Sequence, residues 1–166
     1  VQDGKGIYYF QNGERYEGDY VNGERTGQGI YVYTNGDKYV GQFSNGMQQG
    51  EGTFTWANGA EYTGHWERNQ RSGKGHYKWA NGDEYEGTWK NNMADGEGVL
   101  RTADGSVYTG QFKNGKEDGK GVLINKDGIR YEGTFKDGKK DGSFVETDNT
   151  GKVIRRGTYK FGHLEQ

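Results

Sequence analysis

Residues 108–130 read YTGQFKNGKEDGKGVLINKDGIR, and the segments on both sides of them repeat the same pattern. The repeated tyrosine recurs every 23 residues, at Tyr16, Tyr39, Tyr62, Tyr85, Tyr108 and Tyr131. A glycine follows two residues after each tyrosine and an aromatic residue four residues after it, as in Gly110 and Phe112. A pair of glycines, such as Gly119 and Gly121, comes later in each unit. A fixed period kept over six copies without an insertion is typical of a repeat architecture.

Each unit predicts two short β-strands. Residues 85–89 alternate between one face and the other, which places the tyrosine, the glycine and the ring together. A second strand is expected to follow the glycine pair, as in residues 29–33, and to end at a turn such as Asn35-Gly36. Asn-Gly favours a type I′ turn, in which both central residues have positive φ. Strands joined so closely are antiparallel neighbours, so the sequence predicts an all-β meander of tandem β-hairpin repeats with roughly 13–14 strands.

The composition favours a thin structure held by aromatic packing. Only 29% of the residues are hydrophobic and 32 are glycine, yet 14% are aromatic and none is proline. Disordered segments rarely combine many rings with an absence of proline. The repeated rings are therefore expected to pack on one another in a ladder, with each repeated glycine leaving a gap between rings.

The repeat pattern predicts a single array over residues 1–166. Residues 1–15 form a partial repeat, residues 16–153 form six tandem repeats and residues 154–166 form a degenerate C-terminal capping unit. Atypical terminal units are usual in repeat arrays. The N-terminal partial unit begins at Val1 rather than at a methionine, which predicts that the chain is part of a longer protein.

The unit resembles the MORN (membrane occupation and recognition nexus) repeat. Residues 108–115 and 131–138, YTGQFKNG and YEGTFKDG, are similar to its consensus. Asn69 and Asn92 stand where the turn glycine is expected, and asparagine also accepts positive φ. The resemblance implies an elongated, twisted, single-layered antiparallel sheet with a groove along one face. It also implies a role in protein–protein interaction or in membrane-associated scaffolding.

The candidate binding residues are rings that vary between units, because positions shared by every unit cannot encode a particular partner. Two positions in the second strand carry aromatic residues only in the N-terminal units. These residues are Tyr8, Phe10, Tyr31, Tyr33, Phe54, Trp56, Tyr77 and Trp79. The corresponding C-terminal residues are Leu100, Thr102, Leu123, Asn125, Glu146 and Asp148. The rings either cover the sheet or line a groove for an apolar or amphipathic peptide, for which tyrosine and tryptophan are good anchors.

The sequence therefore predicts a non-catalytic scaffold that binds a protein or peptide through an aromatic-lined groove. Two alternatives stay open: a scaffold associated with phospholipid membranes, and a cell-surface module that binds carbohydrate or choline with its rings. An anionic lipid is a further candidate partner, with Lys139-Lys140 and Arg155-Arg156 as the dibasic steps. A homodimer through the exposed sheet ends is also open.

Other function classes find little support. Basic and acidic residues number 8 and 10 in residues 1–83 and 14 and 14 in residues 84–166, so no nucleic-acid partner is predicted. The glycine pairs precede strands rather than helices, and no nucleophile has triad context, so no enzyme and no cofactor are predicted. His65 and His76 could be cross-strand neighbours, but no third ligand is evident and no metal site is predicted. There is no cysteine, signal region or apolar span, and the localisation stays open.

Overall fold

The computed structural model describes residues 3–166, and Val1 and Gln2 of the predicted partial unit lie outside the described residues. All regular secondary structure within residues 3–166 is β-strand, which confirms the predicted all-β fold. The chain divides into two compact units. Unit 1 comprises Val1–Ala80 and Lys90–Asn92, and unit 2 comprises Asn81–Trp89 and Met93–Gln166. The predicted single array over residues 1–166 stays a prediction.

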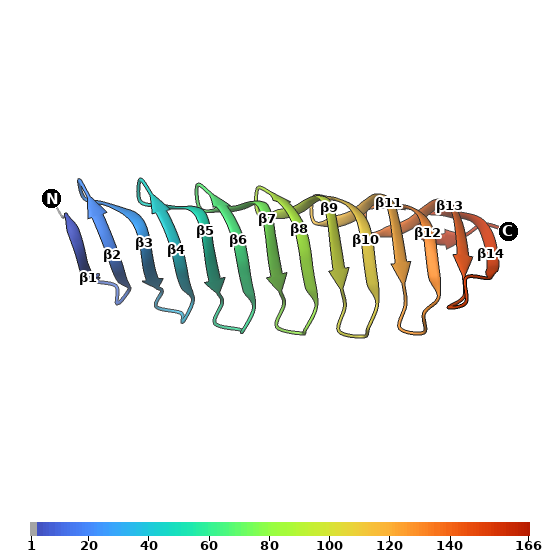
Figure 1. Cartoon of the computed structure of the whole chain (residues 1–166), viewed down its shortest axis with the longest axis horizontal. Helices are drawn as coiled ribbons and strands as arrows, with labels where there is room; N and C mark the ends of the chain where they lie inside the picture. The colour runs from blue at the N-terminus through green and yellow to red at the C-terminus, as the bar shows by residue number, and fades with distance from the viewer. Residues whose placement is uncertain (1–2) are drawn as a thin grey trace. The chain divides into compact units, whose positions relative to one another are not determined.

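Each unit is an antiparallel meander, in which the strands follow one another in the sheet in chain order (Figure 1). The strands of unit 1 are β1 (Gly4–Tyr9), β2 (Arg15–Val21), β3 (Glu24–Val32), β4 (Lys38–Ser44), β5 (Met47–Thr55), β6 (Glu61–Glu67) and β7 (Gln70–Lys78). Those of unit 2 are β8 (Glu84–Lys90), β9 (Met93–Arg101), β10 (Val107–Lys113), β11 (Lys116–Ile124), β12 (Arg130–Lys136), β13 (Lys139–Thr147), β14 (Val153–Lys160) and β15 (His163–Leu164). The described residues thus form 15 strands, slightly more than predicted, because the C-terminal tail adds the short strand β15.

The turn after the second strand of each repeat differs from the predicted type I′ turn. Asn35 and Asn58 do not have positive φ, whereas the glycines that follow them, Gly36 and Gly59, do. The N–H of Gly36 donates to the carbonyl of Tyr33, and the N–H of Tyr33 donates to the carbonyl of Asp37. This is a three-residue hairpin loop, in which a turn is followed by one left-handed glycine.

The type I′ turns lie instead inside the repeats, between β2 and β3 and at the equivalent places. Asn22 and Gly23 have φ of 52° and 81°, and Asn45 and Gly46 have φ of 51° and 79°. Asn69 also has positive φ, which confirms that asparagine replaces the turn glycine there. Because this turn is so tight, the second strand begins directly after it, at Glu24 in β3. The prediction that the strand starts at the glycine pair was wrong.

The core of each repeat is the repeated tyrosine. Tyr39 is fully buried, and its hydroxyl donates to the carbonyl oxygen of Gln42 at 2.8 Å. Its ring meets the edges of two other rings, Phe43 at 5.1 Å and Trp66 at 5.6 Å between centroids. Edge-to-face contacts of this kind are favourable for aromatic pairs. Equivalent tyrosines form the core of the other repeats: Tyr16, Tyr62, Tyr85, Tyr108 and Tyr131. We call the repeated tyrosine and the ring four residues after it the framework rings. Their predicted packing on one another is therefore present in each unit.

The repeated glycines make room for the tyrosine of their own repeat. Gly41 and Gly52 are directly opposite each other in β4 and β5, and the Tyr39 ring lies over both. A Cβ atom at Gly52 would come within 2.5 Å of Tyr39 Cζ, and one at Gly41 within 2.7 Å of Tyr39 Oη. The gap predicted at the glycines is thus filled by the tyrosine of the same repeat.

Candidate functional site

The predicted aromatic residues lie together in unit 1, and seven of them form a continuous row of contacting rings. Successive ring centroids are 5.9, 4.6, 5.7, 4.6, 5.2 and 4.6 Å apart along the row. We call this row the aromatic ladder: Phe10, Tyr31, Tyr33, Phe54, Trp56, Tyr77 and Trp79. The eighth predicted residue, Tyr8, packs against the framework rings of Tyr16 and Tyr20 instead.

The aromatic ladder is only partly covered by the protein. Tyr31 is buried and 9% exposed, whereas Trp79 is 38% exposed. Tyr33, Phe54 and Trp56 are half-buried, like the remaining members of the ladder. A ladder ring therefore packs on its neighbours and still presents part of its surface to solvent. Both roles considered for these rings, covering the sheet and offering a contact surface, are compatible with their positions.

The repeat position that holds Phe10, Tyr33, Trp56 and Trp79 in unit 1 is called the ladder position. In unit 2 it carries polar residues, two of which close hairpin loops. Asn125 Oδ1 accepts hydrogen bonds from the backbone N–H groups of Asp127 and Ile129. Asp148 Oδ1 accepts from those of Thr150 and Lys152. In unit 1 an asparagine inside the loop closes it with the same kind of hydrogen bond: Asn35 Oδ1 accepts from the backbone N–H of Asp37. The rings of unit 1 are therefore not needed to close their loops.

Two arginines lie beside the aromatic ladder, and sequence analysis missed both. The guanidinium carbon of Arg25 is 5.1 Å from the ring centroid of Tyr31. That of Arg71 is 5.6 Å from the ring of Trp56 and 5.2 Å from the ring of Tyr77. Each arginine also donates a 2.8 Å hydrogen bond to the backbone carbonyl of the next type I′ turn. Cations over aromatic faces are attracted by the ring quadrupole.

The arginines share one position in the repeat, nine residues after the repeated tyrosine. That position holds Arg25, Gln48, Arg71, Ala94, Glu117 and Lys140 along the chain. The side chain at this position varies between units, and this variation could have marked it in the sequence as a candidate binding position. Arg25 is an even number of residues from Gly29 and Tyr31 in β3 and is directly opposite Tyr20, so alternation along the strand places it on the ring face.

Four rings of the aromatic ladder, Tyr31, Tyr33, Phe54 and Trp56, border a depression of about 440 Å³ together with the two arginines. The other three rings continue the row outside the lining of this depression. Its lining consists of Arg25, Tyr31, Tyr33, Phe43, Gly46, Gln48, Phe54, Trp56, Trp66, Asn69, Arg71 and Asn92. This lining contains two cationic side chains and no carboxylate. Gln48 is buried between the arginine positions, with its Nε2 3.5 Å from the hydroxyl of Tyr33. We call this depression the ladder groove.

The environment of the ladder groove keeps its tyrosines neutral. Burial is the main cause that raises the pKa of Tyr31 to about 12, and its hydrogen bond to Glu14 adds to the effect. Burial also raises the pKa of Tyr33 and lowers that of Arg71. The phenols therefore act as neutral hydrogen-bonding groups at physiological pH.

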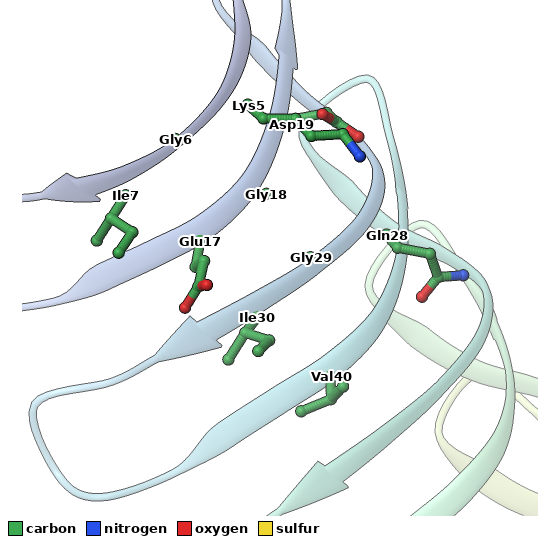
Figure 2. A pocket seen from close by; sticks show the side chains of 10 residues that line it. All are labelled: Lys5, Gly6, Ile7, Glu17, Gly18, Asp19, Gln28, Gly29, Ile30 and Val40. Carbon is green, nitrogen blue, oxygen red and sulfur yellow. The ribbon is translucent and has the colours of Figure 1, made fainter.

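A second depression lies in unit 1 over β1 to β4 (Figure 2). Ile7, Glu17, Ile30 and Val40 are directly opposite one another in successive strands, and their side chains lie close together. This surface has two exposed aliphatic side chains, Ile7 and Val40, and two carboxylates, but no ring among its lining residues. It offers less anchoring chemistry than the ladder groove.

The histidines and the dibasic steps have local partners. His65 is opposite Glu51 and its Nδ1 lies 3.5 Å from Glu51 Oε1, while His76 is opposite Thr63. The two histidines are therefore not directly opposite each other, in contrast to the cross-strand pair considered from the sequence. Lys140 Nζ lies 4.6 Å from the ring centroid of Tyr131, and Arg155 forms a 2.7 Å ion pair with Glu146.

Residues 3–166 contain neither a cluster of metal ligands nor a membrane-spanning helix. No group of three or more His, Cys, Asp or Glu side chains in this range is placed to hold a metal ion. Within the same range no helix is long and apolar enough to cross a membrane.

A family model described as "MORN repeat" matches seven consecutive segments of the chain. The segments are residues 1–15, 16–38, 39–61, 62–84, 85–107, 108–130 and 131–151. The family resemblance predicted from the repeat unit, with about six full repeats and partial ends, is confirmed. No curated protein has a significant sequence match to the chain.

A solved structure has a similar fold at low sequence identity. The TCP domain of SAS-4 (dCPAP) of Drosophila melanogaster, solved in complex with a proline-rich motif of Ana2 (dSTIL), is 14% identical with a TM-score of 0.60. That match covers 96% of this chain and 86% of that chain. The TCP10 domain of Danio rerio CPAP is 18% identical, with coverages of 92% and 99%, but its TM-score is only 0.29. At these identities the first match indicates a similar fold and the second carries no argument.

Proposed function

Because the chain belongs to the MORN repeat family, we propose that it is a non-catalytic scaffold that binds an extended peptide segment of a partner protein in the ladder groove. The observation that carries this proposal is the unbroken contact of seven rings across unit 1, six of which are partly exposed. The family match indicates no enzymatic family.

The chemistry of the groove suits a peptide. Tyrosine, tryptophan and arginine are the residues most often found as hot spots of protein interfaces, and all three line the groove. Their rings hold one another in place, so little conformational entropy is lost when a ligand binds. The Drosophila TCP domain was solved with a proline-rich motif bound, which supports a peptide ligand for a sheet of this kind.

The other ligands considered from the sequence are less well matched to the groove. A cage for choline needs open ring faces around a cation. The guanidinium groups of Arg25 and Arg71 already lie over the rings of Tyr31, Trp56 and Tyr77. Anionic lipid and a homodimer through the sheet ends stay predictions from the sequence.

The decisive variant replaces Trp56 and Trp79 with alanine. The tightest ligand from a library of extended and helical synthetic peptides provides the probe, and isothermal titration calorimetry measures its affinity. We expect the double variant to bind more than tenfold more weakly, because anchoring residues of an interface contribute about 2 kcal/mol or more each. Tyr9→Ala is the matched control, since Tyr9 is 76% exposed and is not part of the ladder.

The proposal requires the loss of affinity to be larger than any loss of stability. If the double variant melts at a much lower temperature and its folded fraction binds normally, the rings serve only the sheet. Vesicles of phosphatidylserine and soluble choline are tested in parallel. Binding of either that depends on Trp56 and Trp79, with no peptide bound, would replace this proposal with one of the alternatives.

A further inference from the structure

Four side chains form a row across the sheet of unit 1, on the face opposite the framework rings. Each member is directly opposite the next one in the neighbouring strand, in the order Ile7, Glu17, Ile30 and Val40. We call these four residues the outer row. Tyr8, the neighbour of Ile7 in β1, packs on the framework rings, so alternation places Ile7 on the other face. Each strand from β1 to β4 thus contributes one side chain to the outer row.

The outer row forms one border of the second depression, which has a volume of about 540 Å³. Ile7 is 51% exposed and Val40 is 42% exposed, so the apolar border is open to solvent. The opposite border is polar and consists of Lys5, Asp19 and Gln28 (Figure 2). The depression therefore runs across the strands. Its lining contains two carboxylates and one ammonium group, which favours a basic ligand.

Glu17 is the charged member of the outer row. Within residues 3–166 its carboxylate has no hydrogen-bond or ion-pair partner. Residues 15–18 and 130–133 both read RYEG, but only in unit 2 does the arginine pair with the glutamate, at 2.7 Å between Arg130 and Glu132. A basic ligand group would therefore meet a free carboxylate at Glu17, with an isoleucine directly opposite on each side.

The spacing of the outer row matches one face of an α-helix. Neighbouring strands lie about 4.8 Å apart, so the four side chains stand at about 0, 4.8, 9.6 and 14.4 Å across the sheet. Residues i, i+3, i+7 and i+10 of a helix share one face and stand at about 0, 4.5, 10.5 and 15 Å along its axis. An extended strand presents side chains to one face about every 6.8 Å, and a polyproline II helix turns about every 9.3 Å. Of these conformations, the α-helix brings one side chain to each strand.

We propose that the outer row binds an amphipathic α-helix of a partner protein, which crosses the strands and carries apolar residues at i, i+7 and i+10 and lysine or arginine at i+3. The basic residue pairs with Glu17. The apolar residues contact Ile7, Ile30 and Val40. Because this surface is on the face opposite the ladder groove, the inference goes beyond the proposed function and does not depend on it. Unit 1 would then hold two partner segments at once.

The probe is a synthetic helical peptide with leucine at i, i+7 and i+10 and lysine at i+3. It is about 18 residues long, because shorter helices are marginal in water. Fluorescence anisotropy measures its affinity for the whole chain. A second peptide has the lysine at i+5, on the opposite side of the helix, with the same composition and net charge. We expect the second peptide to bind about tenfold more weakly, because the charged hydrogen bond to Glu17 is lost.

Reversing the charge of Glu17 tests the pair from both sides. Glu17→Lys is expected to weaken the lysine peptide by about tenfold or more and to strengthen a peptide with glutamate at i+3. Glu132→Lys makes the same change at the equivalent position of unit 2 and is the matched control. It should leave the affinities of both peptides unchanged.

Replacing Ile7 and Val40 together with threonine tests the apolar border. Threonine suits this row, because Thr53 and Thr63 continue it in β5 and β6. The strands should therefore form normally, which circular dichroism checks. We expect this double variant to bind the lysine peptide about tenfold more weakly, since less apolar surface is buried.

Three results would overturn the proposal. The first is equal affinity of the native chain and Glu17→Lys for the lysine peptide. The second is binding of this peptide that depends on Trp56 and Trp79, which would place the helix in the ladder groove and leave the proposed function standing. The third is dimerisation of the chain in sedimentation that the double threonine variant abolishes, with no peptide bound, which would assign the outer row to a second copy.

Discussion

At the scale of single residues, the fold depends on a tyrosine that lies flat over two glycines. The hydroxyl of Tyr39 satisfies the carbonyl of Gln42, and the ring occupies the space above Gly41 and Gly52. Each of the three features is needed for a physical reason: the tyrosine ring for burial, its hydroxyl for a hydrogen bond and the glycines for close approach. The repeat is regular because this small unit tolerates little change.

Gly52→Ala tests this unit directly. The new methyl group would overlap the buried ring of Tyr39, and we expect a loss of about 2–3 kcal/mol in the free energy of unfolding, as in other overpacked cores. Gly6→Ala is the matched control. Gly6 has the same position in the partial first repeat, but the nearest atoms to a Cβ there belong to Tyr8 at 3.4 Å. Urea denaturation of both variants gives the comparison, and equal losses would contradict the proposed role of the tyrosine.

At the scale of the hairpin, two kinds of turn alternate along each unit. The turn inside a repeat needs positive φ at two successive residues, and the loop between repeats needs it at one glycine. Both contain Asn-Gly, so the dipeptide alone did not distinguish them. The deciding difference is loop length, because a two-residue loop favours type I′ and a three-residue loop favours a turn followed by a left-handed residue.

The turn at Arg68-Asn69 leads to a stability prediction. Arg68 has a φ of 47°, which is unfavourable for a residue with a long side chain, whereas Asn22 and Asn45 occupy the equivalent position in other repeats. We expect Arg68→Asn to raise the melting temperature by about 2–4 °C. Glu67→Asn, at the adjacent exposed strand position, is the control and should not raise it. A decrease in the Arg68→Asn variant would show that the arginine side chain contributes contacts that outweigh backbone strain.

Most of the residues that build each hairpin could be predicted from the sequence. The repeated tyrosines, the rings four residues later and the glycines were all identified, because they recur at every unit. The rings of the aromatic ladder were singled out as well, because their two repeat positions carry aromatic residues only in the N-terminal units. Arg25 and Arg71 were missed, although alternation places them on the ring face, because their repeat position carries a different kind of side chain in most units. That a guanidinium group lies over a ring depends on the path of the long side chain, which a periodic pattern does not contain.

At the scale of the whole molecule, the same repeat is used differently in the two units. In unit 1 the ladder position carries rings such as Tyr33 and Trp56, while in unit 2 it carries Asn125 and Asp148, which close loops. The framework explains how the sheet of each unit forms, and the variable positions explain why one unit has an aromatic surface. The proposed binding function therefore belongs to unit 1.

The most direct test of the central claim is nuclear magnetic resonance mapping of a bound proline-rich peptide. The indole N–H signals of four tryptophans and the methyl signals of Ile7, Ile30 and Val40 report on different surfaces. We expect large shifts for Trp56 and Trp79. Trp66 also borders the ladder groove, but its indole N–H is already bonded to the carbonyl of Gly52, so its signal should shift less, and the methyl groups should not shift. Shifts confined to the methyl groups, with Trp56 and Trp79 unchanged, would contradict the claim.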